Sequence, residues 1–177
     1  MKTLMLAVIL LSSPVTARAQ TMPHDDVSQR VQRLEDRAAL KALVDTFSVL
    51  ADRKDVQSQT LLFTEDATVD SYSGDQQTSS LKGRQQIGDA FSAFLANFET
   101  VYHMNGQQTV ALQGDRATGT AYSTVVLIGK EGDRTIRNTA GVIYNDEYVR
   151  RGDRWLIAKR VSHFMWWDRQ EVTQPAR

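Results

Sequence analysis

The sequence predicts an α+β fold in which helices come first and a strongly curved antiparallel sheet follows, with the helices on one side of the curve and a central pocket between them. Two observations support this fold. Apolar residues at helical spacing dominate the first half of the chain, and four long segments rich in β-branched and aromatic residues fill the second half. Helices followed by consecutive strands are typical of α+β proteins. Strands of this length must twist and curl, which leaves a concave interior open at one end.

The first 19 residues are predicted to be a cleaved signal peptide. Lys2 provides a positive start, residues 4–11 are an unbroken apolar run, and residues 17–19 match a small-x-small cleavage pattern. A buried first helix is the alternative. The apolar run is too short to span a bilayer, which takes roughly 20 residues. We therefore expect a mature chain that begins at Gln20, resides in the periplasm or is secreted, and does not associate with a membrane.

Three helices are expected at the start of the folded domain. The first carries one buried apolar stripe, because its large apolar residues fall three or four positions apart. The second starts at an N-cap, Asp55, and the third follows Gly83 and packs an aromatic stripe into the core. The expected boundaries are 28–52 for the first helix and 56–63 for the second, with a short strand at 68–72 before the third.

Four long strands are expected after the helices, separated by turns that contain Gly next to Asp. Gly and Asp tolerate the positive φ angles that tight hairpins require. The folded domain is therefore expected to cover residues 28–168, between a flexible lead-in at 20–27 and a flexible tail at 169–177. The expected strands are 100–113, 116–129, 134–149 and 154–167.

Charge and motif content argue against several functional classes. The chain has 21 Lys and Arg against 21 Asp and Glu, with no basic stripe, so no nucleic-acid partner is expected. It has no cysteine and no P-loop, dinucleotide-binding or catalytic-serine motif. Its histidines, His24, His103 and His163, lie far apart without the spacing of metal ligands. Neither a metal nor an organic cofactor is expected.

His103 and Asp52 are the candidate catalytic residues. Asp52 ends the first helix, where an acidic residue opposes the helix macrodipole and needs another reason to be present. His103 lies near the start of the strand that follows the third helix. If the sheet curls over the helix end, the carboxylate would fix the imidazole tautomer and raise its basicity, giving a general base near neutral pH. In the alternative interpretation, His103 is a structural strand residue and Asp52 a solvated helix end.

Short pieces spread over residues 33–167 point to a known family by their order and spacing rather than by one motif. These pieces are residues 50–55, 63–67, 81–83, His103 with Asn105, 141–148, 152–157, Arg160 and Trp166. Together they resemble the SnoaL-like branch of the nuclear-transport-factor-2-like superfamily, which includes scytalone dehydratase and bile-acid dehydratase. The resemblance implies a cone-shaped sheet closed by helices, with His103 as the acid/base and Asp52 as its partner.

The chain departs from the dehydratase pattern at polar positions. Leu127 stands where a second pocket histidine is expected, Val142 and Tyr144 stand in place of a serine and an asparagine, and Ala51 replaces a tyrosine. The pocket is therefore expected to be more apolar and to lack strong polar specificity. Tyr144 is the candidate for a hydrogen bond to the substrate oxygen. The other expected pocket residues are Tyr72, Val125, Leu127, Val142 and, near the rim, Trp166.

Two functions remain open at this point. The first is an exported, cofactor-free dehydratase or isomerase that acts on a small, mostly apolar molecule through His103 and Asp52. The second is a non-catalytic module that binds a hydrophobic small molecule or dimerises through its open sheet face. The resemblance and the aromatic residues near the C-terminus favour a homodimer. One scaffold hosts many activities, so the resemblance alone does not choose between these functions.

Overall fold

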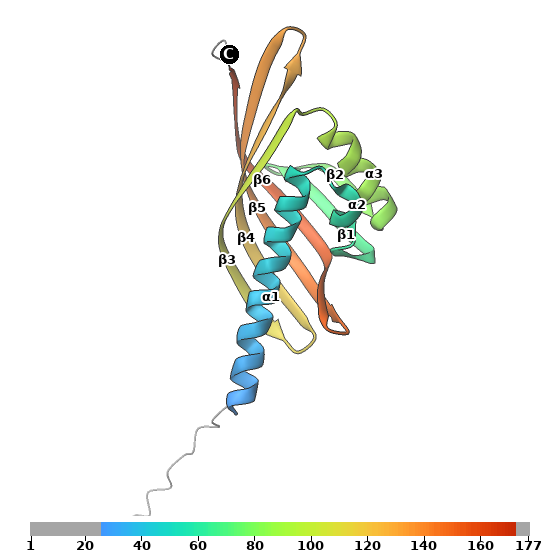
Figure 1. Ribbon diagram of the computed structural model, residues 1–177, viewed down its shortest axis with the longest axis vertical. Helices are drawn as coiled ribbons and strands as arrows, with labels where there is room; N and C mark the ends of the chain where they lie inside the picture. Colours follow the sequence, from blue (N-terminus) through green and yellow to red (C-terminus); the bar gives the residue numbers. More distant parts are fainter. Residues whose placement is uncertain (1–25, 173–177) are drawn as a thin grey trace, which may run out of the picture.

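The computed structural model describes residues 26–172 and contains a six-stranded curled sheet with three helices on one side (Figure 1). The strand order is β2-β1-β6-β5-β4-β3, and every neighbouring pair is antiparallel except β1 with β6, which is parallel. The predicted α+β fold is confirmed. The elements are α1 (Val27–Asp52), α2 (Val56–Thr60), β1 (Phe63–Ser73), β2 (Gln76–Lys82), α3 (Arg84–Leu95), β3 (Thr100–Gln113), β4 (Arg116–Glu131), β5 (Arg134–Arg151) and β6 (Arg154–Glu171).

The long helix α1 lies along β3 and covers the inner face of the sheet (Figure 1). Its buried residues recur at helical spacing, as the sequence predicted, but only from position 36 onward: Asp36, Leu40, Leu43, Val44, Phe47, Ser48 and Ala51. The prediction was wrong for the first turns of the apolar stripe, because Val31 and Leu34 are 46% and 67% exposed. Asp55 caps α2 as expected by accepting a hydrogen bond from the Ser58 N–H at 3.1 Å. The prediction of α2 up to residue 63 was wrong, because β1 begins at Phe63 and the carbonyl of Leu62 already accepts a hydrogen bond from Ile157 in β6.

Each hairpin of the sheet turns on a Gly-Asp pair. Gly74, Gly114, Gly132 and Gly152 have φ between 58° and 60°, as the first central position of a type II′ turn requires. Three of these turns were predicted. The hairpin of β1 and β2 was missed, because β2 is a polar, mostly exposed edge strand without apolar alternation.

The bend of the sheet coincides with irregularities in strand pairing. The register shifts in β3 between Asn105 and Gln108, and between β5 and β6 next to Gly141. Such bulges kink a strand and increase its local twist. A Cβ on Gly141 would lie 2.2 Å from the indole nitrogen of Trp166, so only glycine allows that ring to cross β5. Beyond the bulge β6 continues to Glu171, so residues 169–171 of the predicted tail belong to a strand.

One hydrophobic core fills the space between the helices and the inner face of the sheet. Its fully buried members include Leu40 of α1, Phe63 of β1, Ile87 of α3 and Ile157 of β6. No helix within residues 26–172 is long and apolar enough to span a bilayer. The predicted signal peptide and most of the predicted lead-in lie outside the described residues.

Candidate active site

Asp52 and His103 meet where the C-terminal end of α1 reaches the beginning of β3. The Asp52 Oδ1 atom lies 2.7 Å from Nδ1 of His103, and the backbone N–H of His103 donates to Asp52 Oδ2 at 3.3 Å. The predicted hydrogen-bonded contact of the two side chains is therefore present. A carboxylate at Nδ1 stabilises the tautomer with its proton on that nitrogen, which leaves the lone pair on Nε2.

The local sequence explains why Asp52 stands at the helix end. Lys54 has φ of 56°, the only positive φ among the described non-glycine residues, and it breaks the helix directly after Arg53. The unfavourable position of a carboxylate at a helix C-terminus is offset by the two hydrogen bonds that Asp52 accepts from His103.

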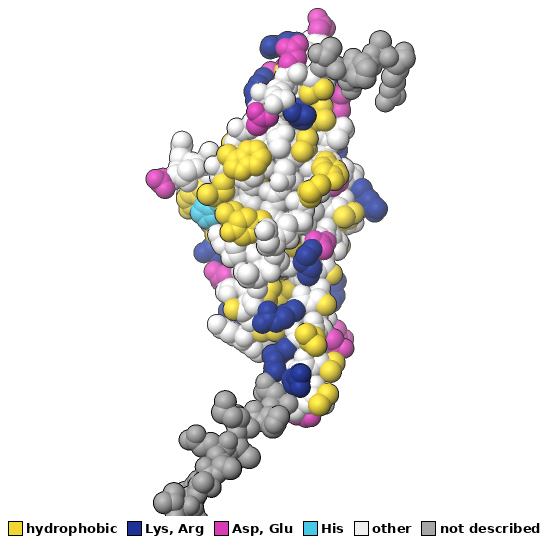
Figure 2. All heavy atoms as spheres, turned by 90° about the vertical axis from the view of Figure 1, so that its left-hand side faces the viewer, with side chains coloured by type: hydrophobic (Ala, Val, Ile, Leu, Met, Phe, Trp, Pro, Cys, Tyr) yellow, Lys and Arg dark blue, Asp and Glu magenta, His cyan; other side chains and the backbone are white. Residues whose placement is uncertain are grey.

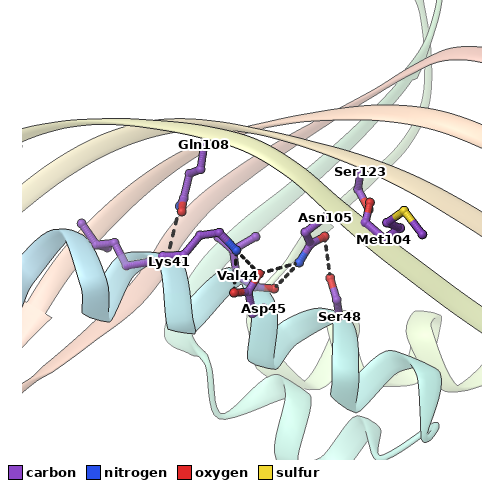
Figure 3. Close-up of polar contacts among 9 residues, drawn as sticks. Lys41, Val44, Asp45, Ser48, Met104, Asn105, Gln108 and Ser123 are labelled. Atoms are coloured by element: carbon purple, nitrogen blue, oxygen red, sulfur yellow. Dashed lines mark hydrogen bonds and ion pairs between the residues drawn. The ribbon is translucent and has the colours of Figure 1, made fainter.

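A line of polar contacts joins α1 to β3 (Figure 3). Asn105 accepts from the Ser48 hydroxyl at 3.0 Å and donates to Asp45 at 3.0 Å. Gln108 donates to the backbone carbonyl of Leu40 at 3.3 Å. These contacts fix how β3 lies along the helix.

Burial changes the electrostatics that the sequence suggested for His103. Its side chain is 7% exposed, whereas that of Asp52 is 26% exposed. The pKa of His103 lies below its ordinary value of about 6.5, and burial is the main cause. The hydrogen bond and the charge of Asp52 raise this pKa, and the charge of Arg160 lowers it. Asp52 therefore raises the pKa of His103 as expected, but burial, which the sequence analysis did not consider, outweighs its effect. The ring is neutral at pH 7, the state that a general base needs.

Arg160 is a buried charge on the inner face of β6, and sequence reasoning assigned it no role. Its side chain is 1% exposed and forms two hydrogen bonds to Asp146, Nε to Oδ1 at 2.8 Å and Nη2 to Oδ2 at 2.7 Å. The Tyr148 hydroxyl donates to the same carboxylate at 2.8 Å. Arg160 and Asp146 occupy inward positions of two paired strands, so period-two alternation was the signal that could have found them.

Tyr144 lies on the inner face, as predicted, and packs against Arg160. The guanidinium carbon of Arg160 is 4.3 Å from the centre of the Tyr144 ring and 4.2 Å from the centre of the Phe47 ring, so the cation lies over both aromatic rings. Burial raises the pKa of Tyr144 to about 12. Tyr144 therefore stays neutral at physiological pH and can donate a hydrogen bond.

The structure divides the other predicted pocket residues between the two faces of the sheet. Val125, Leu127 and Val142 are buried members of the core on the inner side. Tyr72 instead stacks on His163, which pairs with Ile143, and so lies on the outer face. Trp166 crosses Gly141 on the same outer face and is 50% exposed. The bulge at Met165 turns Trp166 outward, so its predicted place at the rim of the inner pocket was wrong, as was the inner position of Tyr72.

Two hollows in the described part of the chain lie on the outer face. One groove of about 390 Å³ is lined by apolar side chains that include Met104, Tyr122, Met165 and Trp166. The other, also about 390 Å³, is polar and contains Lys159 with Glu147. Figure 2 shows this face, with hydrophobic side chains gathered about its middle. Neither groove includes Asp52 or His103, and no three His, Asp or Glu side chains within residues 26–172 gather as metal ligands would.

Comparison with known proteins agrees with the fold. The family profile of the SnoaL-like domain matches residues 32–161. An uncharacterized protein of Mycobacterium tuberculosis is 30% identical over 136 residues, which cover 75% of this chain and 87% of the relative.

Solved structures share the fold at low sequence identity. A candidate scytalone dehydratase from Novosphingobium aromaticivorans superposes with a TM-score of 0.70 at 16% identity, covering 81% of this chain and 93% of the other. The hexachlorocyclohexane dehydrochlorinase LinA-type3 from Novosphingobium barchaimii gives a TM-score of 0.68 at 17% identity, covering 82% and 99%. At these identities the similarity establishes the curled α+β fold.

Proposed function

The chain belongs to the SnoaL-like domain family, and on that premise we propose that it is a cofactor-free dehydratase or isomerase for a small, mostly apolar molecule. His103 acts as the general acid/base, and Asp52 orients it and balances its charge. The structural neighbours named as a dehydratase and a dehydrochlorinase carry names of elimination reactions, in which a proton and a leaving group are both removed.

The observation that carries this proposal is the contact between Asp52 and Nδ1 of His103. Because the 2.7 Å contact occupies Nδ1, Nε2 is the ring nitrogen left to accept a proton. The lowered pKa of His103 supports the same role, since a neutral imidazole is the form that removes a proton. The neighbouring wall of Val125, Leu127 and Val142 supports an apolar substrate.

Proton exchange tests this function without knowledge of the natural substrate. The protein is incubated in D₂O with a panel of small ketones, enones and β-hydroxy ketones, and NMR follows the loss of carbon-bound protons and any loss of water. We expect exchange or dehydration of at least one apolar member with the wild-type protein and none with His103→Ala. Equal rates with both proteins would refute the role of His103.

We further propose that the chain forms a homodimer through its outer sheet face. This proposal applies equally if the protein is a non-catalytic binding module. Met104, Tyr122, Met165 and Trp166 are each 47–60% exposed and line one groove that contains no charged residue. Large exposed apolar patches mark association surfaces. A face without charge can meet its own copy without repulsion.

Trp166→Glu is expected to convert the dimer to a monomer, because it places two negative charges at the centre of the paired faces. Sedimentation velocity measures the change in mass. Leu34→Glu is the matched control, since Leu34 is 67% exposed on α1, away from this face, and its replacement should leave the dimer intact. A wild-type protein that sediments as a monomer at all concentrations would exclude the dimer.

We also propose that the protein is exported and processed. The arrangement of Lys2, the apolar run at 4–11 and the small residues at 17–19 supports cleavage before Gln20. The protein expressed in a Gram-negative host is expected in the periplasmic fraction with an intact mass that starts at Gln20. A soluble cytoplasmic product that keeps residues 1–19 would contradict export.

A further inference from the structure

The N-terminal part of α1 carries an apolar stripe that does not pack on the sheet. Its large apolar residues before position 36 are Val27, Val31 and Leu34, which are 68%, 46% and 67% exposed. They recur every three or four residues, so they lie on one side of the helix. Asp36 and Leu40, which are buried, lie on the opposite side, because 3.6 residues make one turn. The stripe therefore faces solvent.

The first turns of α1 also extend beyond the strands that the helix covers (Figure 1). A helix end that packs on nothing gains little to offset the conformational entropy that it loses. Single exposed apolar residues are common on protein surfaces and need no explanation. A row of them at regular helical spacing is different, because it is the pattern of a contact between two helices.

The spacing of the stripe fits a short parallel coiled coil. With Val31 at position a of the heptad, Val27 and Leu34 fall at the d positions. A β-branched residue at a with leucine at d is the combination that favours two parallel helices. Ala38 takes the next a position, and the charged Lys41 ends the apolar seam at the next d position.

The charges beside the seam match the same arrangement. Arg30 occupies a g position and Glu35 an e position, and both are exposed. In a parallel pair, g of one helix faces the following e of the other, so Arg30 of each copy would face Glu35 of the second copy. In an antiparallel pair, g faces g, which would bring together Arg30 and Arg37 of the two copies. The charges therefore favour the parallel pair.

We propose that the exposed stripe of α1, residues Val27, Val31, Leu34 and Ala38, pairs in parallel with the same stripe of a second copy of this chain. Packing on the sheet already forms the helix in each copy, so pairing does not include the cost of helix nucleation. The seam is shorter than two heptads. The pairing is therefore weaker than an interface of standard size, and it increases with protein concentration.

Cysteine cross-linking tests this pairing, because the chain has no cysteine of its own. Val31→Cys and Leu34→Cys are each oxidised at high protein concentration, and denaturing gel electrophoresis without a reductant detects covalent dimers. We expect dimers from both variants, because equal positions meet in a parallel pair. Gln29→Cys is the matched control. It introduces an exposed thiol at position f, on the side of the helix away from the seam, and should stay monomeric.

Exchange of the flanking charges tests the orientation of the pair. Glu35→Arg, added to Val31→Cys, makes Arg30 face an arginine and should slow cross-linking about 2- to 5-fold, because exposed ion pairs contribute little individually. Adding Arg30→Glu as well restores opposite charges and should restore the rate. A rate that the second exchange does not restore would contradict the parallel pair.

The other outcomes are equally distinct. Cross-linking at only one of positions 31 and 34 would overturn the parallel pair, because an antiparallel pair can bring at most one of them next to its own copy. Absence of cross-links at both positions would overturn pairing altogether. If the protein then binds vesicles of phosphatidylethanolamine and phosphatidylglycerol, and Leu34→Glu abolishes this binding, the stripe contacts a membrane surface instead.

This contact is independent of the proposed homodimer through the outer sheet face. The stripe faces away from the sheet, so an outer-face dimer places its two α1 helices on opposite sides of the paired sheets and cannot produce the cross-links (Figure 1). Trp166→Glu should therefore leave the cross-links of Val31→Cys unchanged. Loss of these cross-links in Trp166→Glu would contradict an independent helix contact.

Discussion

Asp52→Asn and His103→Ala are each expected to lower turnover about 10²–10⁴-fold, the usual effect of losing general acid–base catalysis. His103→Ala removes the base itself. Asp52→Asn keeps the shape of the side chain but removes the negative charge that stabilises the protonated ring and selects its tautomer. Steady-state kinetics on the compound found by proton exchange measures both effects, with circular dichroism to verify the fold.

The pH dependence provides a second readout of the same pair. Because the folded state lowers the pKa of His103, kcat/KM should be constant above about pH 6.5 and should fall as the pH decreases through that lowered pKa. Asp52 raises the pKa of His103, so its replacement by asparagine should move the decline to still lower pH. If Asp52 had only a structural role, the remaining activity of Asp52→Asn would show the same pH dependence as the wild-type protein.

The double variant and a neighbouring control distinguish catalysis from packing. Two residues that act as one unit have non-additive effects, so the double variant should be scarcely slower than either single variant. Ser48→Ala removes the hydrogen bond to Asn105, in the same contact between α1 and β3, without touching Asp52 or His103. It should lower stability and leave kcat unchanged. Wild-type turnover by Asp52→Asn would refute the mechanism.

The sequence predicted the parts of the fold whose side chains repeat with a period. The apolar stripe of α1 and the alternation in the long strands predicted where these elements begin and end nearly correctly. The strand β2 has no such pattern, because an edge strand that faces solvent needs no apolar residues. Its turn nevertheless carries the signal: Gly74-Asp75 repeats the Gly-Asp pair of the other hairpins. Turn chemistry was thus more informative than hydropathy for this strand.

For the candidate site, the sequence predicted the contact between Asp52 and His103 but not the lowered pKa of His103. Asp52 stood out because a carboxylate is unfavourable at a helix C-terminus, and its partner His103 was found opposite it. The pKa of His103 depends on burial and on Arg160, which only the folded structure brings together. Trp166 was misplaced because a bulge changes the face of every residue that follows it.

Asp146→Ala is expected to destabilise the domain by about 3–5 kcal/mol, the usual consequence of removing one partner of a buried ion pair. Asp146 is 3% exposed and accepts both hydrogen bonds of the Arg160 guanidinium and that of the Tyr148 hydroxyl. The substitution leaves a positive charge and a hydroxyl donor buried without an acceptor. Urea denaturation followed by tryptophan fluorescence measures the change in the free energy of unfolding.

Two further variants decide whether the lost stability belongs to the buried pair. Glu147→Ala, at the next position of β5, removes only the exposed contact with Lys159 at 3.7 Å and should have little effect, because exposed ion pairs contribute little. The double variant Asp146→Leu with Arg160→Met replaces both charges by apolar groups. It should recover much of the stability that Asp146→Ala loses, since no unpaired charge then remains in the core. A double variant as unstable as the single one would show that packing around Arg160, rather than its charge, sets the cost.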